Sequence, residues 1–194
     1  PHRRLAPLDG GAVRGDEGEA AFRRLGVAVG KFWVTKRQPV HAAEALECLG
    51  GNGYVEESGM PRLFRDSPLN SIWEGSGNVA ALDVLRAMAR APESVEAFLA
   101  ELDTAAGSDD HYDAALKRLG QVLGDPEEAQ YRARAVVELM ALALQASVLL
   151  RYAPTPVAEA FTTSRLGGEW GHVFGTLPRG VDTELILDRA RPRR

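Results

Sequence analysis

The sequence has very little cysteine, which limits how its fold can be held together. Cys48 is the only cysteine among 194 residues, so no intrachain disulfide can form. This composition suits a reducing compartment, and we expect a cytoplasmic protein in which Cys48 fills the core from a helix face. His41, His111 and His172 are widely separated and form no metal-ligand pattern, so we expect no metal.

Other common signals are also missing. No stretch keeps the alternation of apolar and polar residues that a half-buried strand requires, and no internal repeat is evident. No apolar run is long enough to cross a bilayer and no signal peptide opens the chain, so we expect no membrane contact. The net charge is -4, so binding to nucleic acid would require a local basic face.

The apolar residues that are present recur at the spacing of amphipathic helices. This pattern predicts an all-α fold, a helical bundle with short connections. A first helix is expected from about Glu17, and Pro39 is expected to begin a second helix that ends at Gly50. Asp125 predicts the start of a long helix that runs to about Tyr152 and lies at the centre of the bundle.

Residues 50–78 are the least ordinary part of the sequence. They contain two glycine clusters, the pair Arg65 and Asp66, and a carboxylate, Glu74, between a tryptophan and a glycine. This composition predicts a long ordered loop that brings the backbone close to a ligand, although a glycine-rich connector between helices explains it equally well. Arg65 and Asp66 are expected to form a partly buried ion pair that fixes the loop.

Three blocks within this stretch resemble the C-terminal signature of the acyl-CoA dehydrogenase family. Residues 50–54 (GGNGY), 65–66 (RD) and 73–76 (WEGS) are similar to the family's GGNG-aromatic, RD and aromatic-Glu-Gly-Thr blocks. The spacing between the blocks agrees without a gap, which makes the resemblance much more specific than any one block. Tryptophan in place of the usual tyrosine points to the alkylation-response branch of the family.

The resemblance implies a domain organisation. Residues 17–106 are expected to be the family's C-terminal helical domain and residues 107–194 additional C-terminal helices, with a boundary near residues 105–125. Residues 1–16 are basic and then glycine-rich, without a clean period, and are expected to be a tail or mobile loop. The C-terminal helices of this family build the core of a homotetramer. The family's N-terminal helical domain and middle β domain are not in this sequence, so we expect the chain alone to be inactive.

The intact protein is expected to be an FAD flavoprotein that oxidises a carbon–carbon bond beside an acyl-CoA thioester. Removing the proton next to the thioester carbonyl requires a base, and a carboxylate in a dry pocket has a suitably raised pKa. In the family, the Glu of this motif takes the α proton, so by resemblance Glu74 is the catalytic base. Trp73 would give apolar cover and Gly75 would let the substrate approach the backbone. The alternative for Glu74 is an acid stabilised by a helix dipole.

Two groups of residues are expected to contact the FAD. Ser76, Gly77 and Asn78 occupy the family's Thr-x-Gln positions, and backbone N–H groups at a helix start could bind a phosphate there. Gly50 and Gly51 match a glycine pair that, in the family, touches the ADP part of a flavin held mainly by a neighbouring subunit. Ordinary helix capping is the alternative for the first group.

A second interpretation is binding to double-stranded DNA, with which the alkylation-response branch is associated. Arg86 and Arg90 are neighbours on one predicted helix, and Arg165 lies near the end of a later one. If these arginines converge, they could hold phosphates in a protein with little or no turnover. The alternative is a solvated surface with ordinary ion pairs. A third interpretation, an oligomerisation bundle, is compatible with the flavin role.

Overall fold

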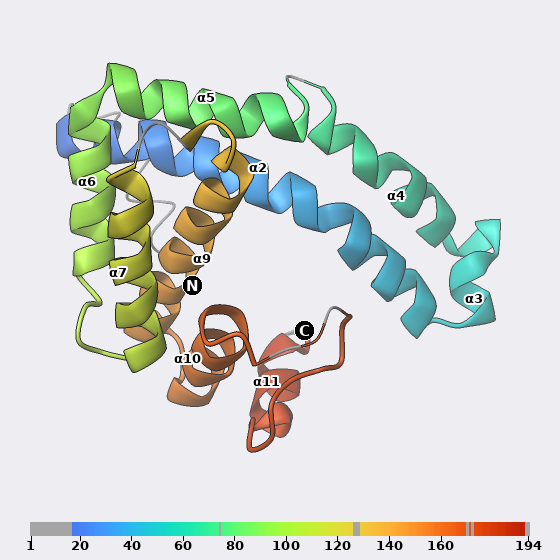
Figure 1. Ribbon diagram of the computed structural model, residues 1–194. Helices are drawn as coiled ribbons and strands as arrows, with labels where there is room; N and C mark the ends of the chain where they lie inside the picture. The colour runs from blue at the N-terminus through green and yellow to red at the C-terminus, as the bar shows by residue number, and fades with distance from the viewer. Residues whose placement is uncertain (1–16, 74, 126–128, 170, 172, 193–194) are drawn as a thin grey trace.

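The computed structural model describes residues 17–73, 75–125, 129–169, 171 and 173–192. Within these residues the secondary structure consists of helices without a strand, so the predicted all-α fold is confirmed (Figure 1). The expected tail at residues 1–16 and the expected base Glu74 lie outside the described residues.

The first described helix, α2 (Glu17–Cys48), is continuous through Pro39, so the prediction that Pro39 begins a second helix is wrong. Proline in a helix interior removes one hydrogen bond and costs about 3 kcal/mol. Packing outweighs that cost, because α2 contacts other helices before and after the proline. The buried side chains of its first half are Phe22, Leu25, Val29 and Phe32.

The expected long loop is mostly a series of short helices. They are α3 (Gly51–Tyr54), the 3-10 helix η1 (Glu56–Ser58), α4 (Met60–Asp66) and the 3-10 helix η2 (Ser67–Ser71). Pro61 and Pro68 stand in the first turns of α4 and η2, where their fixed φ favours helix formation. Gly50 and Gly59 precede α3 and α4 with φ of 58° and 74°, which lets the chain turn between helices.

The second half of α2 and the helices α3 and α4 extend away from the other helices as an arm (Figure 1). We define the arm as residues 33–72. Cys48, expected in the core, is exposed on this arm, because here α2 packs against α3, α4 and η2 and not inside the bundle.

The remaining helices are α5 (Gly77–Arg90), α6 (Pro92–Asp103), α7 (Asp110–Leu123), α9 (Ala133–Tyr152), α10 (Thr155–Phe161) with its π-helical continuation η3 (Thr162–Leu166), and α11 (Thr183–Ala190). These helices form the bundle, except that α11 contacts α10 and buries no residue. Side-chain caps begin two of them: Asp109 accepts a hydrogen bond from Tyr112 N in α7, and Asp182 accepts one from Leu185 N in α11.

Helix α9 lies at the centre of the bundle, as predicted, and contacts α2, α5, α6, α7 and α10. It begins at Ala133 and not near Asp125; residues 126–128 lie outside the described residues. The turn directly before Ala133 is exposed, so no packing holds it helical. Contrary to the expectation from the sequence, α9 is long and apolar enough to cross a membrane, but half of its most apolar window is buried, as in a core helix.

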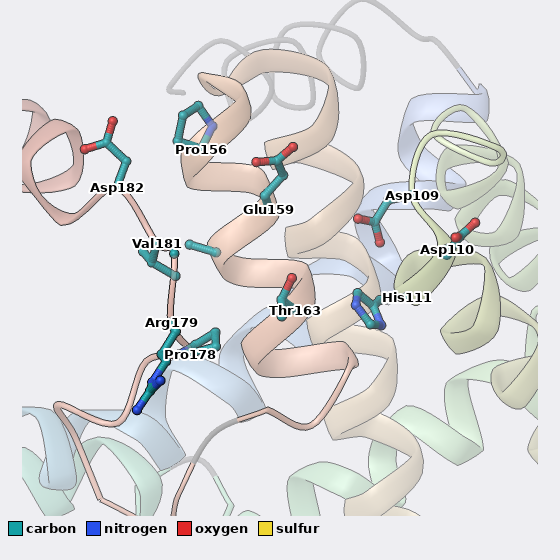
Figure 2. A pocket seen from close by; sticks show the side chains of 12 residues that line it. Asp109, Asp110, His111, Pro156, Glu159, Thr163, Pro178, Arg179, Val181 and Asp182 are labelled. Carbon is teal, nitrogen blue, oxygen red and sulfur yellow. The ribbon is translucent and has the colours of Figure 1, made fainter.

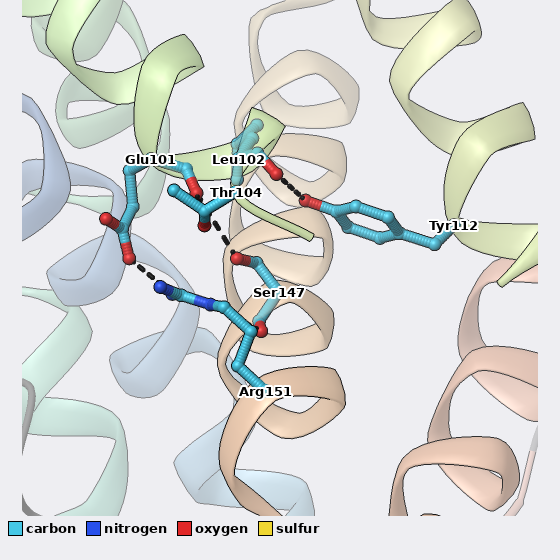
Figure 3. Close-up of polar contacts among 6 residues, drawn as sticks. All are labelled: Glu101, Leu102, Thr104, Tyr112, Ser147 and Arg151. Carbon is cyan, nitrogen blue, oxygen red and sulfur yellow. Dashed lines mark hydrogen bonds and ion pairs between the residues drawn. The ribbon is translucent and has the colours of Figure 1, made fainter. Parts of the chain in front are cut away.

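A buried polar network joins α6, α7 and α9 (Figure 3). Arg151 of α9 forms an ion pair with Glu101 of α6, and their side chains are only 18% and 6% exposed. The Ser147 hydroxyl donates to the Glu101 carbonyl at 3.4 Å, and the Tyr112 hydroxyl donates to the Leu102 carbonyl at 2.7 Å. Burial raises the pKa of Tyr112 to about 12. The predicted additional helices therefore share one core with the predicted family domain.

Candidate flavin and acyl-CoA site

The segment between η2 and α5 carries the WEGS block and is anchored to α2. The Trp73 indole N–H donates to Asn70 Oδ1 at 3.3 Å, and the Asn70 amide donates to Gln38 Oε1 at 2.7 Å. Trp73 is still 52% exposed. Its apolar surface is thus held in place while remaining open to a ligand, which fits the predicted role of covering a substrate.

The glycines of this segment are required by the backbone. Gly75 has a φ of 111°, a conformation that side chains with a Cβ rarely adopt. Gly77 is buried, and a Cβ atom there would lie 2.8 Å from Cδ of Lys36. Lys31 of α2 donates from Nζ to the Trp73 carbonyl at 3.4 Å. The segment therefore lies directly against α2, beside two lysines.

Helix α5 begins at Gly77, so the backbone N–H groups of its first turn lie at this segment. Ser76 is the N-cap residue, but its side chain makes no capping hydrogen bond, so the capping alternative is not realised by Ser76. The N-terminus of a helix carries partial positive charge, and Lys36 adds a full positive charge next to Gly77. Ser76, Gly77 and Asn78 are therefore placed where an anionic group such as a phosphate would be stabilised.

Gly50 and Gly51 lie at the far end of the arm, at the start of α3. A Cβ atom at Gly51 would meet nothing within 4 Å, so its backbone is open to a ligand. Gly53 has a different role that the sequence did not reveal: a Cβ atom there would lie 2.1 Å from the Leu46 carbonyl oxygen. Only glycine lets α3 pack so closely on the end of α2.

The two predicted cofactor groups are not brought together within one chain. Gly77 contacts α2 at Lys36, whereas Gly50 follows the end of α2 at Cys48. These two points on α2 are separated by roughly 18 Å at 1.5 Å per helical residue. One compact ligand group cannot touch both, so the two groups must serve distant parts of a ligand or two different ligands.

Arg65 and Asp66 do not form the predicted buried ion pair. Arg65 donates two hydrogen bonds to the Glu56 carboxylate, at 2.7 and 3.1 Å, and Asp66 pairs with Arg62 at 3.6 Å. All four side chains are exposed. Consecutive residues of a helix point in different directions, which is why Arg65 reaches η1 while Asp66 stays on α4. The hydrogen bond from Arg65 lowers the pKa of Glu56.

The arginines predicted to contact DNA lie in different surroundings. Arg86 is exposed on α5 and pairs with Asp83 at 3.4 Å, and Arg90 ends the same helix. Arg165 lies in η3, where burial and the nearby charge of Arg37 lower its pKa. Binding of these three residues to DNA stays a prediction.

A cavity of about 490 Å³ lies near the C-terminal end, between α7, α10 and the segment before α11 (Figure 2). Asp109, Asp182, Glu159, His111 and Arg179 are among its lining residues. The two aspartates are the caps of α7 and α11. Within the part of the chain that the structure describes, no group of three His, Cys, Asp or Glu residues could hold a metal ion.

The sequence of this chain is similar to those of known proteins. Residues 10–89 match the family model of the acyl-CoA dehydrogenase C-terminal domain. The chain is 40% identical to AidB of Escherichia coli (strain K12), covering 90% of this chain and 31% of that protein. It is 36% identical to acyl-CoA dehydrogenase family member 11 of Caenorhabditis elegans, covering 92% of this chain and 26% of that protein.

The similarity extends to solved structures. The crystal structure of Caenorhabditis elegans ACDH-11 in complex with C11-CoA has a TM-score of 0.67 and 28% identity, over 82% of this chain and 30% of that chain. The chain therefore belongs to the acyl-CoA dehydrogenase family and contains its C-terminal domain. Within that family, this chain is similar to AidB over 90% of the length of this chain. The chain spans about a third or less of each of these relatives.

Proposed function

We propose that the protein containing this chain is an FAD-dependent oxidoreductase that oxidises a carbon–carbon bond beside an acyl-CoA thioester. The observation that carries the proposal is the contact of α2 with the segment before and at the start of α5: Lys31 donates to the Trp73 carbonyl, and Lys36 lies beside Gly77. A relative, ACDH-11, has been crystallised with C11-CoA, which supports an acyl-CoA thioester as the substrate class.

The described residues fit part of a flavin nucleotide. Gly77 leaves room beside Lys36 that a Cβ would fill, and the start of α5 offers N–H groups to a phosphate. Ser76, Gly77 and Asn78 would hold the nucleotide, and the bound flavin would supply the acceptor for the β hydride. Trp73 would exclude water from the acyl chain. We assign removal of the α proton to Glu74, next to Trp73 in the sequence.

The arm supports assembly with further copies of the chain. It exposes many large apolar side chains, which marks a surface for protein contact. The strongest examples are Tyr54 at 79%, Val34 at 64%, Ile72 at 62% and Leu63 at 60% exposed. We propose a cytoplasmic homotetramer in which Gly50 and Gly51 contact the flavin of a neighbouring subunit. The separation of roughly 18 Å along α2 between the two cofactor groups supports this division.

Anaerobic mixing of the natural protein with saturated acyl-CoA thioesters of increasing chain length tests the proposed reaction. We expect the flavin absorbance to bleach without an added electron acceptor, because the substrate itself supplies the hydride. Free coenzyme A, which has no acyl chain to oxidise, is the control and leaves the spectrum unchanged. A flavin spectrum that no thioester bleaches would contradict the proposed activity.

A further inference from the structure

A cavity of about 580 Å³ opens between the C-terminal half of α5, α6, the end of α7 and the start of α9. It is separate from the flavin site, which lies at the opposite end of α5. Its volume lies within the range of about 300–1,000 Å³ that small-molecule sites occupy. Its apolar lining includes Leu82, Leu85, Met88, Val95, Val122 and Leu123.

These apolar side chains are incompletely covered by the protein. Each packs against the hydrophobic core on one side, yet each is only partly buried. The cavity is therefore an open extension of the core. An unbranched hydrocarbon chain placed in it would remove apolar surface from water on both partners, which is the main favourable contribution to such binding.

A charged side chain at the cavity indicates which polar group the hydrocarbon chain carries. Arg86 is the one charged side chain among the lining residues that the structure describes. Its partner Asp83 is 70% exposed and lies 3.4 Å away on the same helix, an exposed pair of the kind that contributes little. The guanidinium can therefore turn to an anionic group with its fork of donors, and a carboxylate matches that fork.

We propose that this cavity binds a free medium-chain fatty acid, with the chain against Leu85, Val95 and Val122 and the carboxylate on Arg86. A single arginine matches the single charge of a carboxylate. A coenzyme A thioester carries several phosphate charges, for which the described lining offers no further cation. The ligand is thus a fatty acid that is not attached to coenzyme A, and its site is distinct from the substrate site of the proposed reaction.

Calorimetric titration of the 194-residue chain with octanoate, decanoate and decanol tests the proposal. Each added methylene should tighten binding about fourfold, so decanoate, with two more methylenes, should bind about fifteenfold more tightly than octanoate. Arg86→Gln should weaken decanoate binding by about tenfold or more, because a charge-assisted hydrogen bond is lost, and should leave decanol binding unchanged. Arg90→Gln, one turn further along α5 and outside the lining, is the matched control.

Two further measurements place the ligand in the cavity. Ala89→Trp fills the cavity from its α5 side and should abolish decanoate binding. If circular dichroism shows that this variant does not fold, methyl NMR of the unchanged chain takes its place. The methyl signals of Leu85, Val95 and Val122 should then shift when decanoate is added. Three results would each overturn the proposal: decanoate binding no tighter than decanol binding, an Arg86→Gln variant that matches Arg90→Gln, or unshifted cavity methyl signals.

Discussion

Glu74→Gln in the natural protein should slow thioester-dependent reduction of the flavin by about 10²–10⁴-fold, the usual contribution of a general base. The amide keeps the size and shape of the side chain but cannot accept the α proton. The flavin should remain bound, since the phosphate contacts that we propose come from Ser76, Gly77 and the start of α5. Stopped-flow spectroscopy under anaerobic conditions measures the rate.

The control for this variant is Glu57→Gln, which removes an exposed carboxylate of η1 on the arm. It should reduce flavin at the rate of the unchanged protein. Equal rates for Glu74→Gln and Glu57→Gln would show that Glu74 only complements the dipole of α5 and that another residue is the base.

Arg151→Met should lower the free energy of unfolding by about 3–5 kcal/mol, the typical effect of breaking a buried ion pair from one side. Glu101 is 6% exposed at its side chain, so the carboxylate cannot recover its hydration when the guanidinium is removed. The variant should also weaken the link between α6 and α9. Urea denaturation followed by circular dichroism measures the loss.

A double variant separates charge from packing. Glu101→Met combined with Arg151→Met removes both charges and should recover much of the lost stability, because no uncompensated charge stays buried. Arg62→Met, which breaks an ion pair whose side chains are 82% and 65% exposed, should change stability little. A single Arg151→Met variant as stable as Arg62→Met would contradict the structural role of the pair.

Local sequence signals predicted much of the fold. Helix α9 ends at Tyr152, as expected, because the end of an apolar stripe depends on neighbouring residues. The predictions failed where packing of distant segments decides the outcome. Pro39 stays inside α2 because η2 and α4 pack on the same helix, and the arm holds residues 51–71 in short helices.

The candidate site shows the same limit. The family blocks identified Trp73, Gly75 and Ser76, because a motif is a local pattern. Lys31 and Lys36 were missed: they reach the site only because α2 packs against Trp73 and Gly77, and Trp73 is 42 residues beyond Lys31 in the chain. The close contact of Gly53 with the Leu46 carbonyl and the cavity beside Arg86 likewise arise from tertiary packing, for which the sequence gives no periodic signal.

The flavin content of the purified natural protein tests the central claim most directly. The phosphate site that we propose consists of the backbone at Gly77 beside Lys36 and the start of α5. Release of the cofactor by denaturation, followed by chromatography and absorbance, gives the FAD-to-subunit ratio. We predict about one FAD per subunit, because each copy of the family domain would provide one binding site. A protein that contains no flavin, and that takes up none when incubated with FAD, would contradict the account.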